Sequence, residues 1–506
     1  PTGAFRCSKP LYNLIHEAVL RGQVSNLASV PTDCPQRGER MGWMGDAQLT
    51  ADEAMHNFDM AAFYEKYLED IRRSVREDGA LSDVTPPYWP LYPTDPAWGT
   101  AYATIAWAMY EYYGDTRVLE RHYEGLRHYV GFLESISEEH IVRHGKYGDW
   151  CPPACTYPKR TPVPLTSTFY YYKDTLTLAK IAELLGKADD ARAYTERAAA
   201  IREAFNREFN DRGKYAVNRM SPIDGHGNQT SQLLAFALDL VPPEDREQCE
   251  RILLREVVNR FDYHPDTGIV GTRYLFEVLS ALGHPDIAHR ILSQTSYPSL
   301  GYMIEQGATT LWERWENLSG VGMNSHNHIM FGSVDTWFYR TLCGITMTEP
   351  AWRRVRIAPW LAPDLTHAEA SLETVQGTLR AGWKRTVETG AAGSAGAAGS
   401  AGAAGSAGAG SSVNAASSDG VVSATDAATI VTTVSVTVPV GTVAEVHLPC
   451  GPQTTVRESG TSLESGTPLE ARSPGAPTAA GAVHAVSRSG ETLVVTVGSG
   501  SYRFEW

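Results

Sequence analysis

Charged and aromatic side chains crowd the stretch PTDCPQRGERMGWMGDAQ at residues 31–48, namely Asp33, Arg37, Glu39, Trp43 and Asp46. The proline and three glycines that follow Asp33 work against regular structure, which predicts a loop that lines a cleft. A helix is expected to begin near Asp46, because an acidic side chain suits a first turn. Fixed carboxylates beside an apolar ring are suited to binding a sugar. Arginine–carboxylate pairs that only pin a loop would give the same pattern, so spacing alone leaves both interpretations open.

A second stretch, GATTLWERWENL at residues 307–318, places Glu313 between two tryptophans. Apolar walls adjust the pKa of a carboxyl group, as an acid–base catalyst requires. Two separated carboxylates are the minimum apparatus of glycoside hydrolysis, because one protonates the leaving oxygen and the other activates water or attacks the sugar. A glutamate at a helix start that pairs with Arg314 is the structural alternative.

The elements that must position these side chains change character along the chain. Apolar residues recur at intervals of three and four from residue 1 to about 345, which predicts about eleven helices with no strands between them. A doubly wound sheet would need such strands. The helices come in long and short pairs, which favours a toroid of paired helices, one ring inside the other.

After about residue 346 the pattern alternates with period two and is rich in Val and Thr, as in half-buried strands. We predict an all-β C-terminal sandwich over 346–506, following a helical domain over 1–345. A Gly/Ala/Ser-rich insert at about 389–418 interrupts it, and its small residues cannot bury apolar area, so we expect a disordered loop there.

Composition narrows the possible partners. The 506-residue chain carries a net charge of −14 with a pI near 5.6, which argues against nucleic acid, whose binding domains usually present a basic surface. The sequence contains no run of 18 apolar residues, so no membrane span is expected. The seven cysteines are sparse, and only Cys151 and Cys155 are close together, so neither a disulfide framework nor a zinc site is expected. The chain opens PTGAFRCSKP, which suggests a processed or truncated start and leaves the compartment unpredicted.

The sequence resembles the α-L-rhamnosidases of glycoside hydrolase family 78. The resemblance rests on SNLASVPTDCPQRGERMGWMGDAQ, DPAWGTA, YGDWCPP, TGIVGTRYLFEVLS, GATTLWERW, NHIMFGSVDTWFYR, RRVRIAP and VGSGSYRFEW, which occur in order over nearly the whole chain. It implies an (α/α)6 barrel followed by a C-terminal β-sandwich, in agreement with the periodicity. Family members usually carry β-domains before the barrel, so the chain is expected to correspond to the catalytic core and tail of a longer protein.

The resemblance also implies roles. Glu39 in RGER corresponds to the general acid and Glu313 in TTLWER to the general base of a reaction that inverts the anomeric configuration and needs no cofactor and no metal. The substrate would be a rhamnose-containing glycoside or polysaccharide. Residues that match the family's rhamnose pocket are Asp33, Arg37, Trp43, Asp46, Trp98, Trp150 and His328. By residue type alone, His328 is more often a structural histidine near a helix start.

Two features depart from the family pattern. Gly38 stands where relatives commonly have Asp, which removes a negative charge next to the expected acid and is expected to lower the pH optimum. Only 14 residues separate Glu313 from His328, where many relatives have a longer glycine-rich loop, so the aglycone side is expected to differ. A glycosidase of the same fold acting on another sugar, or a catalytically impaired rhamnose-binding relative, are the alternatives to an α-L-rhamnosidase.

Overall fold

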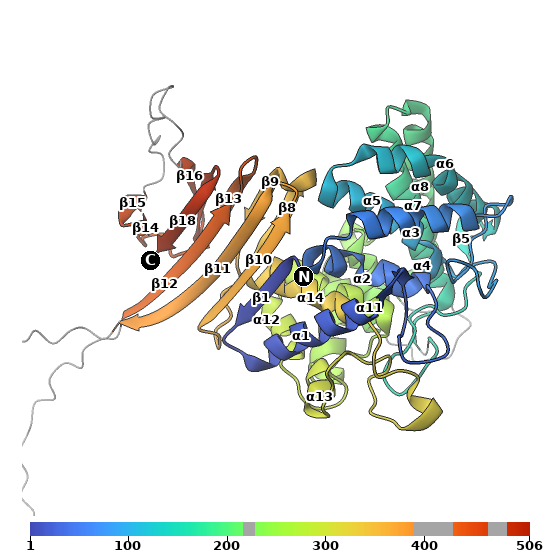
Figure 1. The fold of residues 1–506 in the computed structure, drawn as a ribbon, viewed down its shortest axis with the longest axis horizontal. Coiled ribbons are helices and arrows are strands. Elements are labelled where there is room, and N and C mark those ends of the chain that lie inside the picture. The colour runs from blue at the N-terminus through green and yellow to red at the C-terminus, as the bar shows by residue number, and fades with distance from the viewer. Residues whose placement is uncertain (159, 216–227, 389–428, 464–482) are drawn as a thin grey trace, which may run out of the picture.

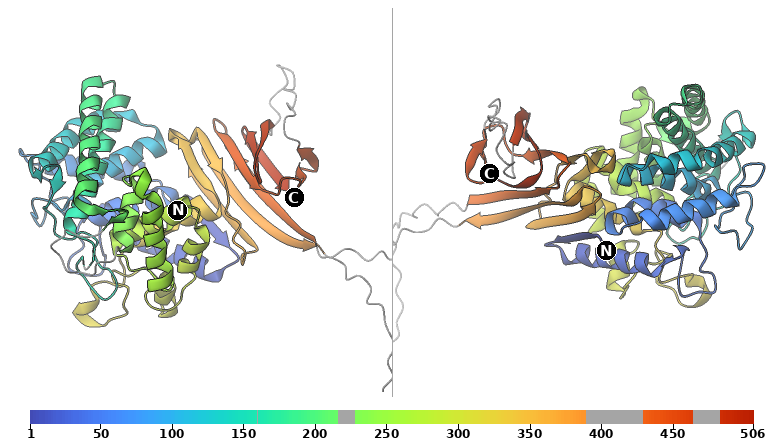
Figure 2. Two further views of the ribbon diagram at one scale, coloured as in Figure 1. Left: turned by 180° about the vertical axis from the view of Figure 1, so that it is seen from behind. Right: turned by 45° about the horizontal axis from the view of Figure 1, so that its top comes forward.

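A computed structural model describes residues 1–158, 160–215, 228–388, 429–463 and 483–506. Helices occupy one side of the molecule and strands the other (Figure 1). Two further views show the same division, with the strands of the C-terminal half lying together beside the helices (Figure 2). The insert expected at about 389–418 lies outside the described residues.

Among the described residues, six inner helical segments alternate along the chain with six outer helices. The outer helices bury one face and expose charged residues on the other: α1 (Pro10–Ser25), α3 (Ala61–Ser74), α6 (Thr116–Ser135), α8 (Ala188–Phe209), α10 (Arg246–Leu254) and α12 (Pro285–Leu292). The inner segments are buried over most of their surface: α2 (Met44–Asn57), α5 (Ala101–Tyr113), α7 (Val163–Leu184), α9 (Gln229–Ala237), α11 (Ile269–Ala281) and α14 (Asp335–Trp337), which continues to Leu342 as a π-helical turn. Helices apolar on every side belong in a core, so the two kinds form the concentric rings that the periodicity predicted.

Two shorter helices lie outside this alternation, α4 (Pro96–Gly99) and α13 (Leu300–Glu305). Three small hairpins join helices: β2 (Leu27–Ala28) with β3 (Val30–Pro31), β4 (Ser137–Glu138) with β5 (Ile141–Val142), and β6 (Asn210–Asp211) with β7 (Lys214–Tyr215). They are two-residue strands, too short for a period-two signal.

Two sheets form the sandwich. The larger has the order β1-β10-β11-β12-β18-β14-β15 and the smaller the order β16-β17-β13-β9-β8. Their strands are β1 (Gly3–Cys7), β8 (Ile345–Glu349), β9 (Arg354–Ile357), β10 (His367–Thr374), β11 (Gly377–Glu388), β12 (Thr429–Val438), β13 (Val443–Pro449), β14 (Val456–Glu458), β15 (Thr461–Leu463), β16 (Val483–Ser489), β17 (Thr492–Val497) and β18 (Gly500–Glu505). Alternate residues are buried along β10, β13 and β17, as expected when one face of each sheet covers the core.

The three hairpins and strand β1 show that the expectation of no strands before residue 345 is wrong. Strand β1 (Gly3–Cys7) is the one that joins the sandwich. It pairs antiparallel with β10, with Arg6 opposite Glu369, at the edge of the larger sheet. Five residues before a helix carry too short a pattern to reveal a strand whose partner lies at the other end of the chain. The first residues of the chain therefore belong to the sandwich.

The sandwich packs directly on the helices. Phe5 of β1 stacks on Phe338, with ring centroids 4.7 Å apart, and the Trp383 indole of β11 donates a 2.9 Å hydrogen bond to the Leu342 carbonyl. These aromatic rings are buried, and burying each stabilises the fold by roughly 1.5–3 kcal/mol. Helices and strands thus share one apolar core.

The seven cysteines are buried and free, as expected from their spacing. Within the described part of the chain, every helix is too short or too polar to cross a membrane.

Candidate active site

Glycines 42 and 45 let the 31–48 stretch pass close to its neighbours. A Cβ at Gly42 would lie 2.0 Å from the Thr85 carbonyl oxygen, and one at Gly45 would lie 2.4 Å from the Trp98 ring. Helix α2 begins at Met44, close to the expected position, with Asp46 in its first turn. The loop before α2 is therefore held against the barrel rather than free in solvent.

Asp33 holds this loop closed. Its carboxylate accepts a 2.9 Å hydrogen bond from the Met41 backbone N–H, and its own N–H donates to the Met41 carbonyl at 3.1 Å. Burial raises the pKa of Asp33 to about 6, although the charge on His328 opposes the rise. Asp33 is thus mainly ionised at neutral pH, with one oxygen engaged by the backbone.

Glu39 lies between Arg37 and Trp43. Its Oε2 pairs with Arg37 Nη2, and its Oε1 accepts a 2.8 Å hydrogen bond from the Trp43 indole N–H. Each carboxylate oxygen therefore has its own donor, and the side chain is only 16% exposed. These contacts fix the direction of the carboxyl group, which acid catalysis requires.

Glu313 contacts the same Arg37 guanidinium, although it lies near the other end of the helical domain in the sequence. Its Oε2 accepts from Arg37 Nη1 at 3.2 Å, and its Oε1 accepts from the Asn324 amide at 3.0 Å. The Glu313 backbone N–H also donates a 2.9 Å hydrogen bond to the Ser325 carbonyl, in the connection that leads to His328. A single arginine side chain thus bridges the two candidate catalytic carboxylates.

His328 completes the polar cluster. Its Nε2 lies 2.8 Å from Asp46 Oδ1 and its Nδ1 lies 3.4 Å from Glu313 Oε2. Burial alone would lower the pKa of His328, but the Glu313 and Asp46 carboxylates outweigh it and raise the pKa to about 9. His328 is therefore cationic at neutral pH and connects the α2 side of the site to Glu313.

The three expected tryptophans meet around a residue that the sequence analysis did not single out, Tyr147. Its ring centroid lies 5.7 Å from Trp43, 4.6 Å from Trp98 and 5.7 Å from Trp150. Asp95 accepts a 2.7 Å hydrogen bond from the Tyr147 backbone N–H. Tyr147 lies in the YGDW motif, which was the available signal. Together the rings make an aromatic wall beside the Glu39–Trp43 pair.

Asp149 fixes the loop that carries Trp150, one of the rings of the aromatic wall. Its buried carboxylate accepts hydrogen bonds of 2.9 Å from the backbone N–H groups of both Gly268 and Gly271. The Trp150 carbonyl also accepts a 2.8 Å hydrogen bond from the Ile269 N–H. The first turn of α11 is thus capped by the loop that carries Trp150.

The short connection between Glu313 and His328 supplies two further residues that the sequence analysis missed. Asn324 binds Glu313, and Ser325 Oγ accepts a 2.5 Å hydrogen bond from Gln36 in the loop before α2. Asn324 has a positive φ of 62°, which is uncommon for residues other than glycine. The connection therefore orients Glu313 as well as linking it to His328.

Asp33, Cys34 and Glu39 are the described side chains whose arrangement best fits a metal ion, with ligand atoms within 4.8 Å of one another. Burial raises the pKa of the Cys34 thiol, which disfavours the thiolate that binds metals. Asp33 is engaged by the backbone and Glu39 by Arg37 and Trp43. These partners leave the three side chains a poor fit to a metal ion.

Comparison with known protein families gives two matches. The family described as bacterial alpha-L-rhamnosidase 6 hairpin glycosidase domain matches residues 1–342, and the bacterial alpha-L-rhamnosidase C-terminal domain matches residues 344–392. The first covers more than half of the chain and agrees with the six inner and six outer helical segments, so the expected barrel-plus-sandwich fold is confirmed.

Individual relatives agree. The chain is 33% identical over 399 residues to an alpha-L-rhamnosidase of Formosa agariphila and 34% identical over 390 residues to one of Streptomyces avermitilis, in each case over 76% of this chain but only 42% and 36% of the relative. A solved alpha-L-rhamnosidase structure from Dictyoglumus thermophilum has 43% identity and a TM-score of 0.84, covering 100% of this chain and 50% of that one. The Streptomyces avermitilis enzyme complexed with L-rhamnose has 29% identity and a TM-score of 0.78, covering 100% of this chain and 42% of that one. The chain thus spans less than half the length of these curated relatives.

Proposed function

Because this chain belongs to the bacterial alpha-L-rhamnosidase six-hairpin glycosidase family, we propose that it hydrolyses terminal α-L-rhamnosyl bonds. The observation that supports this most directly is the arrangement of Glu39 and Glu313 on the single Arg37 guanidinium, beside an aromatic wall. Two carboxylates held by one guanidinium beside aromatic rings suit acid–base cleavage of a glycoside.

In the proposed reaction, Glu39 is the general acid. Its proton passes to the glycosidic oxygen, which departs with the electrons of the broken bond. Glu313 takes a proton from a water molecule, whose oxygen bonds to the anomeric carbon from the opposite face of the sugar. The anomeric configuration is therefore inverted. Arg37 holds both carboxylates, and Asn324 and His328 fix Glu313.

The remaining residues are proposed to bind the sugar. Asp33 and Asp46 carry acceptors for ring hydroxyls, and charge-assisted hydrogen bonds of this kind give specificity. The aromatic wall of Trp43, Trp98 and Trp150 is suited to the apolar 6-methyl group of a deoxy sugar. A rhamnose-containing glycoside or polysaccharide is the substrate class that these contacts favour.

Hydrolysis of an aryl α-L-rhamnoside tests the proposal. We expect release of rhamnose, with the β-anomer seen first by proton NMR, because an intervening water places the new hydroxyl on the opposite face. Aryl glycosides of other sugars serve as controls and should be turned over far more slowly. If the α-anomer is seen first, Glu313 is a nucleophile rather than a base. Turnover of another sugar alone would reject the rhamnoside assignment.

Gly38→Asp is expected to move the high-pH limb of the kcat/KM profile upward by about half to one pH unit. Gly38 is exposed and a Cβ there meets nothing within 4 Å, so the new side chain fits. Its negative charge favours the protonated form of a nearby acid, and activity is lost only when that acid loses its proton.

The matched control is Gly38→Asn, which has nearly the same shape without the charge. An equal shift in both variants would show that the loop conformation, rather than charge, sets the limb. A shift downward in Gly38→Asp would contradict the role of Glu39 as the protonated group.

A further inference from the structure

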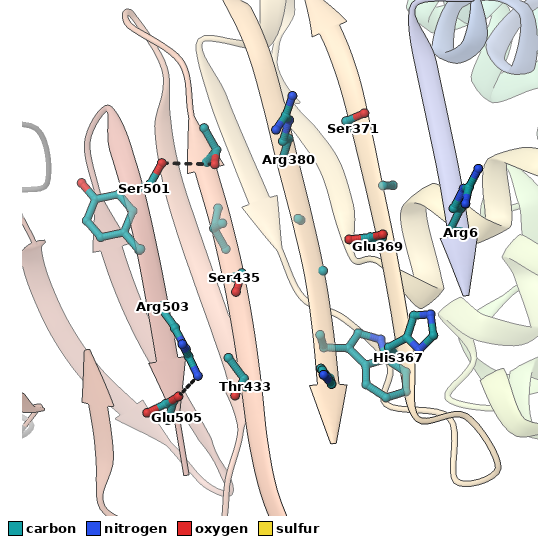
Figure 3. A pocket seen from close by; sticks show the side chains of 18 of the residues that line it. Arg6, His367, Glu369, Ser371, Arg380, Thr433, Ser435, Ser501, Arg503 and Glu505 are labelled. Carbon is teal, nitrogen blue, oxygen red and sulfur yellow. Dashed lines mark hydrogen bonds and ion pairs between the residues drawn. The ribbon is translucent and has the colours of Figure 1, made fainter. Parts of the chain in front are cut away.

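The outer face of the larger sheet is hollowed into a groove of about 1050 Å³ that is separate from the candidate active site. Figure 3 shows its side chains rising from β1, β10, β11, β12 and β18. Every second residue of a strand points to the same side of a sheet, so this face is set by alternate positions.

The strand register arranges these positions in three rows across the sheet. One row contains Arg6, Glu369, Gly382, Ser435 and Arg503, each opposite the next. The row on one side contains Ala4, Ser371, Arg380, Thr437 and Ser501. The row on the other side contains His367, Lys384, Thr433 and Glu505. Gly382 and Ser435 make a low floor at the centre, with long basic side chains around it.

The charge of this face is opposite to that of the chain. The groove is lined by four cations, Arg6, Arg380, Lys384 and Arg503, against the two acids Glu369 and Glu505, an excess of two positive charges on a chain of net charge −14. Arg503 pairs with Glu505. Arg6, Arg380 and Lys384 are exposed and form no ion pair with any described side chain. The face therefore has basic side chains available to an anionic ligand.

We propose that this face binds a carboxylate-bearing polysaccharide chain, the polymer that would carry the rhamnosyl groups released at the active site. The inference rests on the proposed function for the link to rhamnose, and on the groove for binding. Unpaired cations recognise carboxylates, and the hydroxyls of Ser371, Ser435 and Thr433 match the many hydroxyl groups of a sugar.

The spacing favours a chain over a small anion. Arg380 and Lys384 lie four residues apart on β11, which places them about 14 Å apart along the strand. At this backbone separation each cation can hold its own carboxylate, so carboxylates spaced along a polymer can pair with both at once. Several weak contacts on one chain add through high effective concentration, so binding should depend on polymer length.

Binding of polygalacturonate, which carries carboxylates and no rhamnose, tests the proposal by affinity electrophoresis at low salt. We expect retardation that weakens as salt increases, because exposed charges are screened. The Arg380→Ala/Lys384→Ala double variant should bind about tenfold more weakly, since each exposed charge contributes modestly. Arg380→Lys/Lys384→Arg should bind as the parent does, because it keeps both charges.

Arg192→Ala/Arg212→Ala is the matched control, since it also removes two exposed cations, both of them in the helical domain. Equal retardation of the parent and the double variant would overturn the proposal, as would equal retardation by a neutral galactan. A dimer that only the double variant loses would also overturn it, because the face would then bind a second copy. Aryl rhamnoside hydrolysis should be unchanged in the double variant, and its absence in the parent would reject the proposed function without affecting the binding result.

Discussion

Glu39→Gln is expected to lose about 10²–10⁴-fold more kcat on a rhamnose disaccharide than on a nitrophenyl rhamnoside. A sugar alkoxide is a poor leaving group and needs the proton, whereas nitrophenolate departs with little help. Glutamine keeps an oxygen that can accept from the Trp43 indole, which donates to Glu39 at 2.8 Å in the parent. The amide nitrogen would face Arg37 Nη2, which pairs with Glu39 Oε2 in the parent, and any displacement that results affects both substrates alike. The ratio of the two losses therefore reports the missing proton. Initial rates on both substrates measure it.

Glu305→Gln provides the control for this substitution, because Glu305 is exposed on α13 and its charge lies outside the site. It should leave both rates unchanged. If Glu39→Gln lowers kcat by similar factors on the two substrates, Glu39 is not the general acid. Losses of less than a few-fold on both would make it a structural residue, with Asp33 and Asp46 as the next candidates.

Periodicity predicted most of the fold because the helical repeat of three to four residues and the strand repeat of two are physically distinct. Helices of the inner ring, such as α7, and strands such as β12 are long enough to show their periods. Strand β1 escaped prediction because its stability comes from pairing with β10, and no local pattern encodes a partner at the other end of the chain. The hairpin strands were not predicted because two residues are too few to show a period.

The motifs singled out residues that the structure brings together, whereas local chemistry left two interpretations open. Spacing alone left a structural salt-bridge network as a plausible reading of residues 31–48, and the structure does contain such pairs. What no motif revealed is that Arg37 bridges to Glu313, that Tyr147 is the ring about which the tryptophans gather, and that Asn324 orients the second carboxylate. These contacts join segments far apart in the chain and depend on side-chain directions that only the folded barrel fixes.

Gly42 and Gly45 illustrate the same limit. Their sequence context indicated a break in regular structure, which is correct for Gly42 but wrong for Gly45, because Gly45 lies in the first turn of α2. The stronger reason for glycine is the close approach of the Thr85 carbonyl and the Trp98 ring, which leaves no room for a Cβ. Gly38, in the same stretch, has open space around it. One residue type therefore serves two purposes within eight positions, and sequence alone does not separate them.

Glu313→Gln is expected to lower kcat by similar factors on the disaccharide and the nitrophenyl rhamnoside, by about 10²–10⁴-fold, because a base activates water whatever group departs. The substitution also removes the negative charge that contributes most to the raised pKa of His328, which is about 9 in the parent. The His328 ring should then lose its proton at lower pH, and NMR titration of that ring would show the change independently of activity. Glu305→Gln should alter neither reading. A leaving-group dependence in Glu313→Gln, together with its absence in Glu39→Gln, would reverse the two roles. An unchanged His328 titration would instead mean that Asp46, 2.8 Å from His328 Nε2, is sufficient to hold the proton, and that Glu313 is electrostatically independent of the histidine.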